Sequence, residues 1–155
     1  MTTDYFWIDL GFDISVAIPL TKTREVLSFP LSSLCLIPGV RPELLGVSNQ
    51  RGNLLWVIDL PQLLMPTRGR YQAPQTLGNT KAVVLVGEGG FQAAAIAVGF
   101  KGILSFEAAA LTPTDRPYLS AQAVHSEAAI GILDVDQVFA LFQKGGRFQG
   151  VGVGN

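Results

Sequence analysis

An internal repeat constrains this chain more than any other feature of its sequence. Three kinds of segment recur in the same order, at a nearly constant offset of half the chain length. The matched segments are Ala17–Leu20 with Ala95–Val98, Glu25–Phe29 with Gly102–Phe106, and Val57–Leu64 with Ile132–Phe139. A single match arises easily by chance, but three in one order indicate two structural units of the same plan.

Strand patterns dominate both units. Tyr5–Leu10 and Ile14–Leu20 flank turn residues and predict a hairpin. In the second unit, Ala82–Val86 and Ala93–Val98 flank Gly87–Gly90 and predict another. Short strands in regular succession tend to close up, because closure leaves fewer exposed sheet edges. We therefore predict a mainly β fold made of two small barrels.

Helical patterns are short. We expect a turn or two at Thr21–Leu27, one turn at Val40–Gly46, and a terminal helix at Asp136–Gln143 with Asp136 as its N-cap. Asp59 and Asp134 hold matching places after a strand in the two units. Their position predicts that each ends a strand or caps a short helix.

The chain is interpreted as one domain, 1–155, with barrel-like halves at about 5–65 and 81–142. Whether strands are exchanged between the halves is left open. The segment 66–80 is rich in proline and glycine and is predicted to be a linker. The glycine-rich stretch 145–155 is predicted to be a flexible tail.

The composition argues against several classes of protein. Apolar residues make up 48% of the chain and charged residues 15%, which supports a sizeable core and argues against disorder. A net charge of −1 gives no attraction to nucleic acid. The apolar stretch Gly89–Phe100 is shorter than the roughly 20 residues that span a membrane. With a single cysteine and no basic leader, we expect a cytoplasmic protein without membrane insertion.

No constellation of residues indicates catalysis, and we expect no enzyme activity. His125 is the only histidine, and no nucleophile elbow accompanies it. Metal-binding spacings of cysteine, histidine and carboxylates are missing, so no metal or cofactor is expected. Cys35 lies between two leucines and is interpreted as a small core residue.

One stretch of the first unit carries a resemblance to a known family. Ile37–Gly52 has an apolar-Pro opening, a short turn and a Gly-Val-Ser-Asn-Gln-Arg-Gly run, and Leu54–Leu60 follows as an apolar strand ending in Asp-Leu. With Arg24–Leu27 upstream, this pattern resembles the CheW family of chemotaxis adaptors. The resemblance extends from about Tyr5 to Phe142.

The resemblance implies two SH3-like five-stranded β-barrels packed on a shared core, with short helices. It also implies an adaptor that couples a CheA-type histidine kinase, through the kinase regulatory domain, to methyl-accepting chemoreceptors. In the family, the kinase binds barrel end to barrel end, and the receptor tip lies in the groove between the barrels. Gly99 and the alanine-rich stretch Ala108–Ala128 depart from the family pattern, as in a divergent member serving pilus-driven motility or phototaxis.

Seven residues are predicted to bind a partner: Arg51, Glu25, Asn49, Gly52, Val26, Leu27 and Val47. Arg51 is chosen first, because arginine is common at binding hot spots. Two interpretations of Arg51 stay open, an interface contact and a pair with Glu25 or another acid that fixes the turn. Asn49 is expected to support that turn with its side chain. Trp56 lies within an apolar strand and is interpreted as a core residue.

Other functions are compatible with the same sequence. A β-barrel that binds a small molecule is the main alternative, because small residues such as Ala93–Ala97 leave room for a cavity. A small barrel is usually filled by its own side chains, which counts against this alternative. The second alternative function is a stand-alone protein-interaction module that is no longer tied to a kinase.

Overall fold

The computed structural model describes residues 1–11, 13–66 and 79–144. The first repeat unit contains β1 (Thr2–Gly11), β2 (Ile14–Pro19), η1 (Leu20–Lys22), β3 (Thr23–Phe29), η2 (Leu31–Ser33), β4 (Leu44–Gln50), β5 (Asn53–Ile58) and α1 (Leu60–Leu64). The second contains β6 (Thr80–Val86), η4 (Glu88–Gly90), β7 (Gln92–Ala97), β8 (Gly99–Glu107), η5 (Ala108–Ala110), β9 (Leu119–His125), β10 (Ala128–Leu133) and α2 (Val135–Lys144). Each unit thus has five strands followed by an α-helix, and both predicted hairpins are confirmed.

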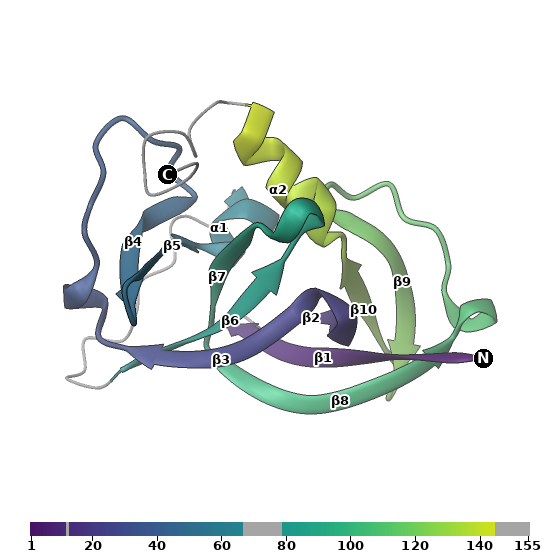
Figure 1. Cartoon of the computed structure of the whole chain (residues 1–155). Coiled ribbons are helices and arrows are strands. Elements are labelled where there is room, and N and C mark those ends of the chain that lie inside the picture. The colour runs from purple at the N-terminus through teal and green to yellow at the C-terminus, as the bar shows by residue number, and fades with distance from the viewer. Residues whose placement is uncertain (12, 67–78, 145–155) are drawn as a thin grey trace.

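The strands form two five-stranded sheets that lie side by side, with α2 above their junction (Figure 1). Sheet A has the order β8-β1-β2-β10-β9, and sheet B has the order β3-β6-β7-β5-β4. Replacing each strand by its counterpart in the other unit turns one order into the other. The relation between the units is therefore an approximate two-fold, and each sheet takes three strands from one unit and two from the other. The predicted mainly β class with two five-stranded sheets is confirmed.

The repeat extends to the strand register. The pairing of β4 with β5 shifts between Leu44 and Gly46. The pairing of β9 with β10 shifts between their repeat counterparts, Leu119 and Ala121. Since a β-bulge bends a strand and increases its twist, both units bend their fourth strand at the same point.

A short segment pairs with the fourth strand of each unit just beyond this bulge. Cys35 and Val47 exchange two backbone hydrogen bonds of 2.9 Å each, and Thr112 and Gln122 exchange bonds of 2.8 and 2.9 Å. The backbone of Gly46 approaches this segment so closely that a Cβ atom would lie 2.7 Å from the Cys35 carbonyl oxygen. Gly46 also has a φ of +148°, which L side chains rarely adopt.

The central strands are buried on both faces. In β5, Trp56 and Ile58 enter a core shared by the two sheets, whereas Val57 faces a smaller core within sheet B. The shared core also contains Ile8, Leu10, Val16 and Ile18 of sheet A, Val83 and Leu85 of sheet B, and Leu60, Leu63, Val138 and Phe139 of the helices. Trp56 is 3% exposed, so its assignment to the core is confirmed. Burial on both faces explains why these strands are almost continuously apolar.

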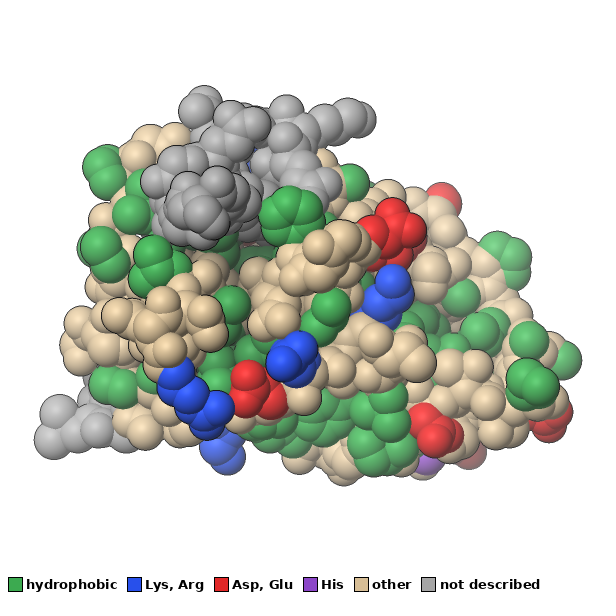
Figure 2. All heavy atoms as spheres, in the orientation of Figure 1, with side chains coloured by type: hydrophobic (Ala, Val, Ile, Leu, Met, Phe, Trp, Pro, Cys, Tyr) green, Lys and Arg blue, Asp and Glu red, His purple; other side chains and the backbone are tan. Residues whose placement is uncertain are grey.

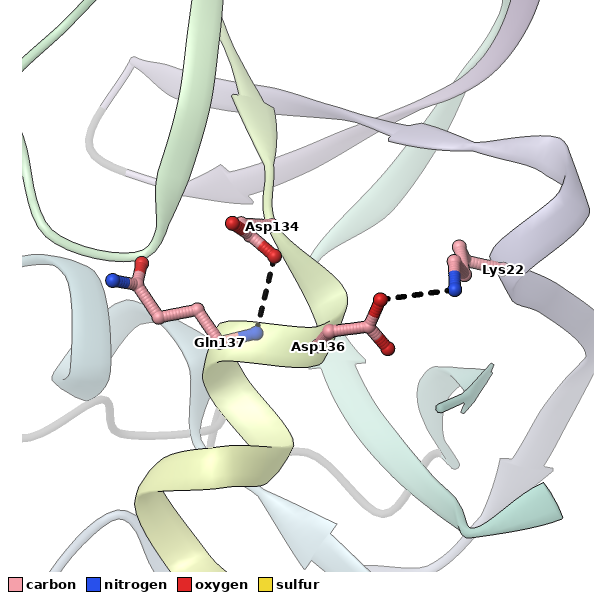
Figure 3. A network of polar contacts seen from close by, with 4 residues as sticks. All are labelled: Lys22, Asp134, Asp136 and Gln137. Carbon is pink, nitrogen blue, oxygen red and sulfur yellow. Dashed lines mark hydrogen bonds and ion pairs between the residues drawn. The ribbon is translucent and has the colours of Figure 1, made fainter. Parts of the chain in front are cut away.

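An aspartate caps the helix of each unit, as predicted. The Asp59 carboxylate accepts a hydrogen bond from the Gln62 N–H at 3.1 Å. The Asp134 carboxylate accepts one from the Gln137 N–H at the same distance (Figure 3). Each bond satisfies a backbone donor that the first turn of a helix would otherwise leave without a partner.

The helix predicted at the end of the second unit is confirmed, but Asp136 is not its N-cap. The helix begins earlier, at Val135, so the capping position falls on Asp134. The Asp136 carboxylate instead pairs with the Lys22 ammonium at 3.0 Å (Figure 3). This ion pair ties the helix to η1, where the chain passes from sheet A to sheet B.

Two predicted helices are wrong. Thr21–Leu27 forms the end of η1 and most of β3, because this segment finds a strand partner in β6, far along the chain. Val40–Gly46 forms turns followed by the start of β4. In both places, long-range pairing overrides weak local helical preference.

The interpretation of Cys35 as a core residue is also wrong, because its side chain is exposed while its backbone pairs with β4. Most of the predicted linker, 67–78, and the predicted tail, 145–155, lie outside the described residues. No helix in the described part of the chain is both long and apolar enough to cross a membrane.

Candidate interaction surface

The third strand of the first unit positions the charged residues of the candidate surface. β3 lies at the edge of sheet B, and its pairing with β6 shifts between Thr23 and Val26. Arg24 and Glu25 fall within this irregularity, and both are exposed. Since bulges redirect side chains, this shift presents two neighbouring charges at the surface.

The first of two grooves along β3 lies at one end of sheet B and is called the end groove. Its volume is about 410 Å³, and it brings together Glu25 from β3, Arg51 from the β4–β5 turn, and Phe91, the residue just before β7. Leu54, 49% exposed, and Phe91, 38% exposed, add apolar surface beside the charges. The predicted residues Arg51 and Glu25, far apart in the sequence, thus line one groove.

The position of Arg51 follows from a two-residue turn. Gln50 pairs with Asn53, so Arg51 and Gly52 are the whole loop, with φ values of 56° and 86°. Positive φ at both central residues is the type I′ geometry that suits the twist of a hairpin. The Asn49 side chain accepts a hydrogen bond from the Gly52 N–H at 3.0 Å, which confirms its predicted role in supporting the turn. The turn projects Arg51 outward, and Arg51 is exposed.

An ion pair that holds Arg51 in the turn, one of the two interpretations left open by the sequence, is not formed with Glu25 or with another acid in the described part of the chain. Among the described residues, the ion pairs within 4.0 Å are Lys22–Asp136, Arg41–Glu43, and the N-terminal amine with Glu107. The turn is therefore held by its own hydrogen bonds, and the Arg51 guanidinium remains accessible at the groove.

The second groove, called the inter-sheet groove, lies between the two sheets and has a volume of about 220 Å³. Its apolar walls are two cross-strand pairs, Val26 with Val83 in sheet B and Ile103 with Phe6 in sheet A. Val26 is 47% exposed and Ile103 is 55% exposed. Arg24 and Glu25 line this groove as well as the end groove, so the two grooves adjoin along β3.

The space-filling view shows the same arrangement. Hydrophobic side chains reach the surface along the lower part of the face, where β3, β1 and β8 run, with charged side chains beside them (Figure 2). Since isolated apolar side chains are ordinary on protein surfaces, the informative feature is their grouping in a groove lined by both sheets.

Two of the apolar residues predicted to contact a partner, Leu27 and Val47, are partly or fully buried. Leu27 is half-buried and packs against the small core of sheet B. Val47 is 3% exposed and belongs to the shared core, so its side chain is not at the surface. Ile103, Phe6, Leu54 and Phe91 line the grooves but were not predicted. The repeat contained a signal for Ile103, because it is the counterpart of Val26 in the second unit.

A larger cavity near the sheet junction is separate from both grooves. Its volume is about 480 Å³, and it is lined by the β1–β2 turn, the end of α1 and the segment before β9. Asp13, Glu43 and Arg116 are the charged residues of its described lining. Neither His125 nor Cys35 lines it.

The single histidine, His125, packs against an aromatic side chain. The His125 ring packs edge-on against the Trp7 ring, with centroids 5.1 Å apart, and the Lys101 ammonium lies 4.9 Å from the Trp7 ring centre. In the described part of the chain, no three His, Cys, Asp or Glu residues are grouped as a metal ion would require.

Comparisons with known proteins give one family match and a match to a solved structure. Residues 5–143 match the family model described as CheW-like domain. The crystal structure of the scaffolding protein TtCheW from Thermoanaerobacter tengcongensis is similar to this chain, with a TM-score of 0.74 and 17% sequence identity. The similarity covers 90% of this chain and 93% of that protein. The comparison with curated proteins finds no match.

Proposed function

The chain belongs to the CheW family, and from this premise we propose that it is a non-enzymatic signalling adaptor that couples a CheA-type histidine kinase to chemoreceptors. One observation carries the proposal for this chain. The end groove and the inter-sheet groove adjoin through Arg24 and Glu25, so two partners bound in them would contact each other or the same side chains.

In this proposal, the regulatory domain of the kinase binds at the end groove. Leu54 and Phe91 supply the apolar contact, and Arg51 supplies a guanidinium that can bind a carboxylate through two hydrogen bonds. Asn49 and Gly52 act indirectly, because their hydrogen bond holds the turn that projects Arg51.

The chemoreceptor tip occupies the inter-sheet groove. Val26 and Ile103 are its main apolar contacts, supported by Val83 and Phe6. Because Glu25 and Arg24 line both grooves, occupation of one changes the electrostatic surroundings of the other. An adaptor of this kind works in the cytoplasm, without a cofactor or nucleic acid.

Calorimetric titration with the regulatory domain of the CheA-type kinase from the same organism tests this function. We expect saturable binding that Arg51→Ala weakens by about 1–3 kcal/mol, which is about fivefold to 150-fold, with the melting temperature unchanged. Arg116→Ala is the matched control, because Arg116 is an exposed arginine that lines the separate cavity.

Other outcomes would change the proposal. An Arg51→Ala protein that melts several degrees lower would make Arg51 a structural residue of the turn. No binding at high concentration, with the kinase domain verified as folded, would leave an interaction module for another partner.

The 480 Å³ cavity favours a second candidate, the binding of a small molecule, because known ligand sites have volumes of roughly 300–1,000 Å³. A thermal-shift screen distinguishes the two functions. Stabilisation by one class of metabolite, with no response to the kinase domain, would support the second candidate.

A further inference from the structure

The segment just before the fourth strand is repeated in the two units. The matched residues are 41–44 (Arg-Pro-Glu-Leu) and 116–119 (Arg-Pro-Tyr-Leu). In the first unit, the Asp59 N–H donates a hydrogen bond to the Glu43 carbonyl at 2.7 Å. In the second unit, the Asp134 N–H donates one to the Tyr118 carbonyl at 2.8 Å. Both segments therefore follow one backbone plan, and what separates them is the chemistry of their side chains.

One side-chain difference leaves the second arginine without the partner of the first. The Arg41 guanidinium donates to the Glu43 carboxylate from Nε at 3.1 Å and from Nη2 at 3.4 Å. Arg116 has Tyr118 in the place of Glu43, and none of the ion pairs found among the described residues includes Arg116. Arg116 lines the cavity of about 480 Å³ near the sheet junction, so its guanidinium is available to a ligand there.

This cavity, called the junction cavity, has apolar walls from both units. They include Leu63 and Leu64 of α1, Val16 of β2 and Leu119 of β9. Gly131 of β10 also lines it, and the counterpart of Gly131 is Trp56, whose indole belongs to the shared core. A Cβ atom at Gly131 would lie 2.6 Å from Cδ1 of Leu119. The second unit thus has no side chain at the place where the first unit has an indole.

The backbone beside the cavity is strained at Tyr118. Its φ is 67°, a left-handed conformation that bulky residues rarely adopt. Its counterpart Glu43 is not among the residues with positive φ. Such strain persists only where the surroundings hold it, and it is concentrated at ligand sites and active sites. A strained tyrosine that lines a cavity next to an unpaired arginine therefore points to a binding site.

We propose that the junction cavity binds a small monocarboxylate with a compact apolar body, a ligand class that rests on the second candidate function. The planar guanidinium of Arg116 binds the carboxylate through two hydrogen bonds, and the apolar body lies against the leucines of α1. Two acids also line the cavity. Glu43 is already paired with Arg41, whereas Asp13 is exposed and belongs to none of the ion pairs found among the described residues. A second negative charge on the ligand would be repelled by Asp13, which disfavours dicarboxylates.

Calorimetric titration of the whole protein tests the ligand class. The probes are phenylacetate and hydrocinnamate, each compared with its primary amide, and phenylsuccinate as the dicarboxylate. We expect both monocarboxylates to bind, and the amides and phenylsuccinate to bind about tenfold more weakly. Arg116→Gln should weaken binding of the monocarboxylates by about tenfold and leave that of the amides unchanged. Lys81→Gln is the control, because Lys81 is an exposed cation outside the cavity lining.

The repeat supplies a second variant. Tyr118→Glu gives the second unit the Arg-Pro-Glu sequence of the first, so the new carboxylate should pair with Arg116 as Glu43 pairs with Arg41. The pair would compete with the ligand and weaken binding of the monocarboxylates by about tenfold. Tyr118→Gln is the matched control, because it removes the phenol without adding a charge. Melting temperatures verify that each variant is folded.

Two results would overturn the proposal, and neither affects the adaptor function, which is read from binding of the kinase domain. If the amides bind as tightly as the acids, or Arg116→Gln leaves the affinity for the acids unchanged, the cavity takes small molecules but not through their carboxylate. If the folded protein binds neither the acids nor the amides at millimolar concentration, this ligand class is wrong, and the thermal-shift screen alone decides the second candidate function.

Discussion

The β4–β5 turn and the β9–β10 turn have one backbone geometry and different side chains. Arg51 and Gly52 have φ values of 56° and 86°, and their counterparts Ser126 and Glu127 have φ values of 50° and 67°. Both loops contain two residues, since Gln50 pairs with Asn53 and His125 pairs with Ala128. The first turn has a glycine at its second position, whereas the second turn places a glutamate in the left-handed region.

The support beneath the two turns differs as well. Asn49 holds the first turn through its bond to the Gly52 N–H, but its counterpart, Val124, has no polar side chain and is 69% exposed. The repeat has therefore kept the backbone path of both units, while the first turn alone combines a relaxed backbone with a displayed arginine. A duplicated fold can separate the task of forming a scaffold from the task of binding a partner.

The largest difference in stability between the two units is expected for substitutions at Gly46 and at its counterpart Ala121. Gly46→Ala should lower the free energy of unfolding by about 3 kcal/mol, because a φ of +148° strains any L side chain and the new Cβ meets the Cys35 carbonyl oxygen at 2.7 Å. Ala121→Gly should cost only about 0.5–1 kcal/mol, as for glycine within a strand. Urea unfolding measures both. Equal losses would mean that the two bulges tolerate side chains alike.

A smaller difference is expected between the two capping aspartates. Asp59 is fully buried, whereas Asp134 is partly exposed and can be replaced in its role by water. We expect Asp59→Ala to lower the free energy of unfolding by about 2 kcal/mol and Asp134→Ala by about 1 kcal/mol. Asparagine at each position, which retains a capping oxygen, is the control. A larger loss at Asp134 would show that the α2 cap matters more than burial.

The turns themselves should give the smallest effects, with opposite signs. Gly52→Ala should destabilise the protein by about 1 kcal/mol, because alanine tolerates positive φ poorly although space is open around Gly52. Glu127→Gly should stabilise it by up to about 1 kcal/mol, because it removes the same strain from the second turn. Thermal unfolding of both variants measures the difference. Two changes of the same sign would contradict the strain argument.

Local patterns were sufficient for the parts of the fold that depend on neighbouring residues. The hairpins around Gly87–Gly90 and before Ile14 have strand residues on both sides of a turn, and Asp59 and Asp134 sit at the end of a strand. The repeat made each of these predictions twice. For the same reason, the exposed Val26 could have identified Ile103 as a second surface residue.

The parts that failed depend on distant pairing. β3 was mistaken for a helix because its strand partner, β6, lies in the other repeat unit. Cys35 has apolar neighbours in the sequence, yet only its backbone is engaged, by a bridge to Val47. The volume and lining of each groove arise where segments from both units meet, so periodicity within one segment carries no information about them.

The division of strands between the sheets has a consequence for the integrity of the molecule. Each repeat unit supplies two strands to one sheet and three to the other, so neither unit can complete a sheet alone. The architecture corresponds to an intertwined dimer of half-length chains whose ends have been fused. A chain cut between α1 and β6 would therefore yield two mutually dependent fragments, which regain structure only by complementation.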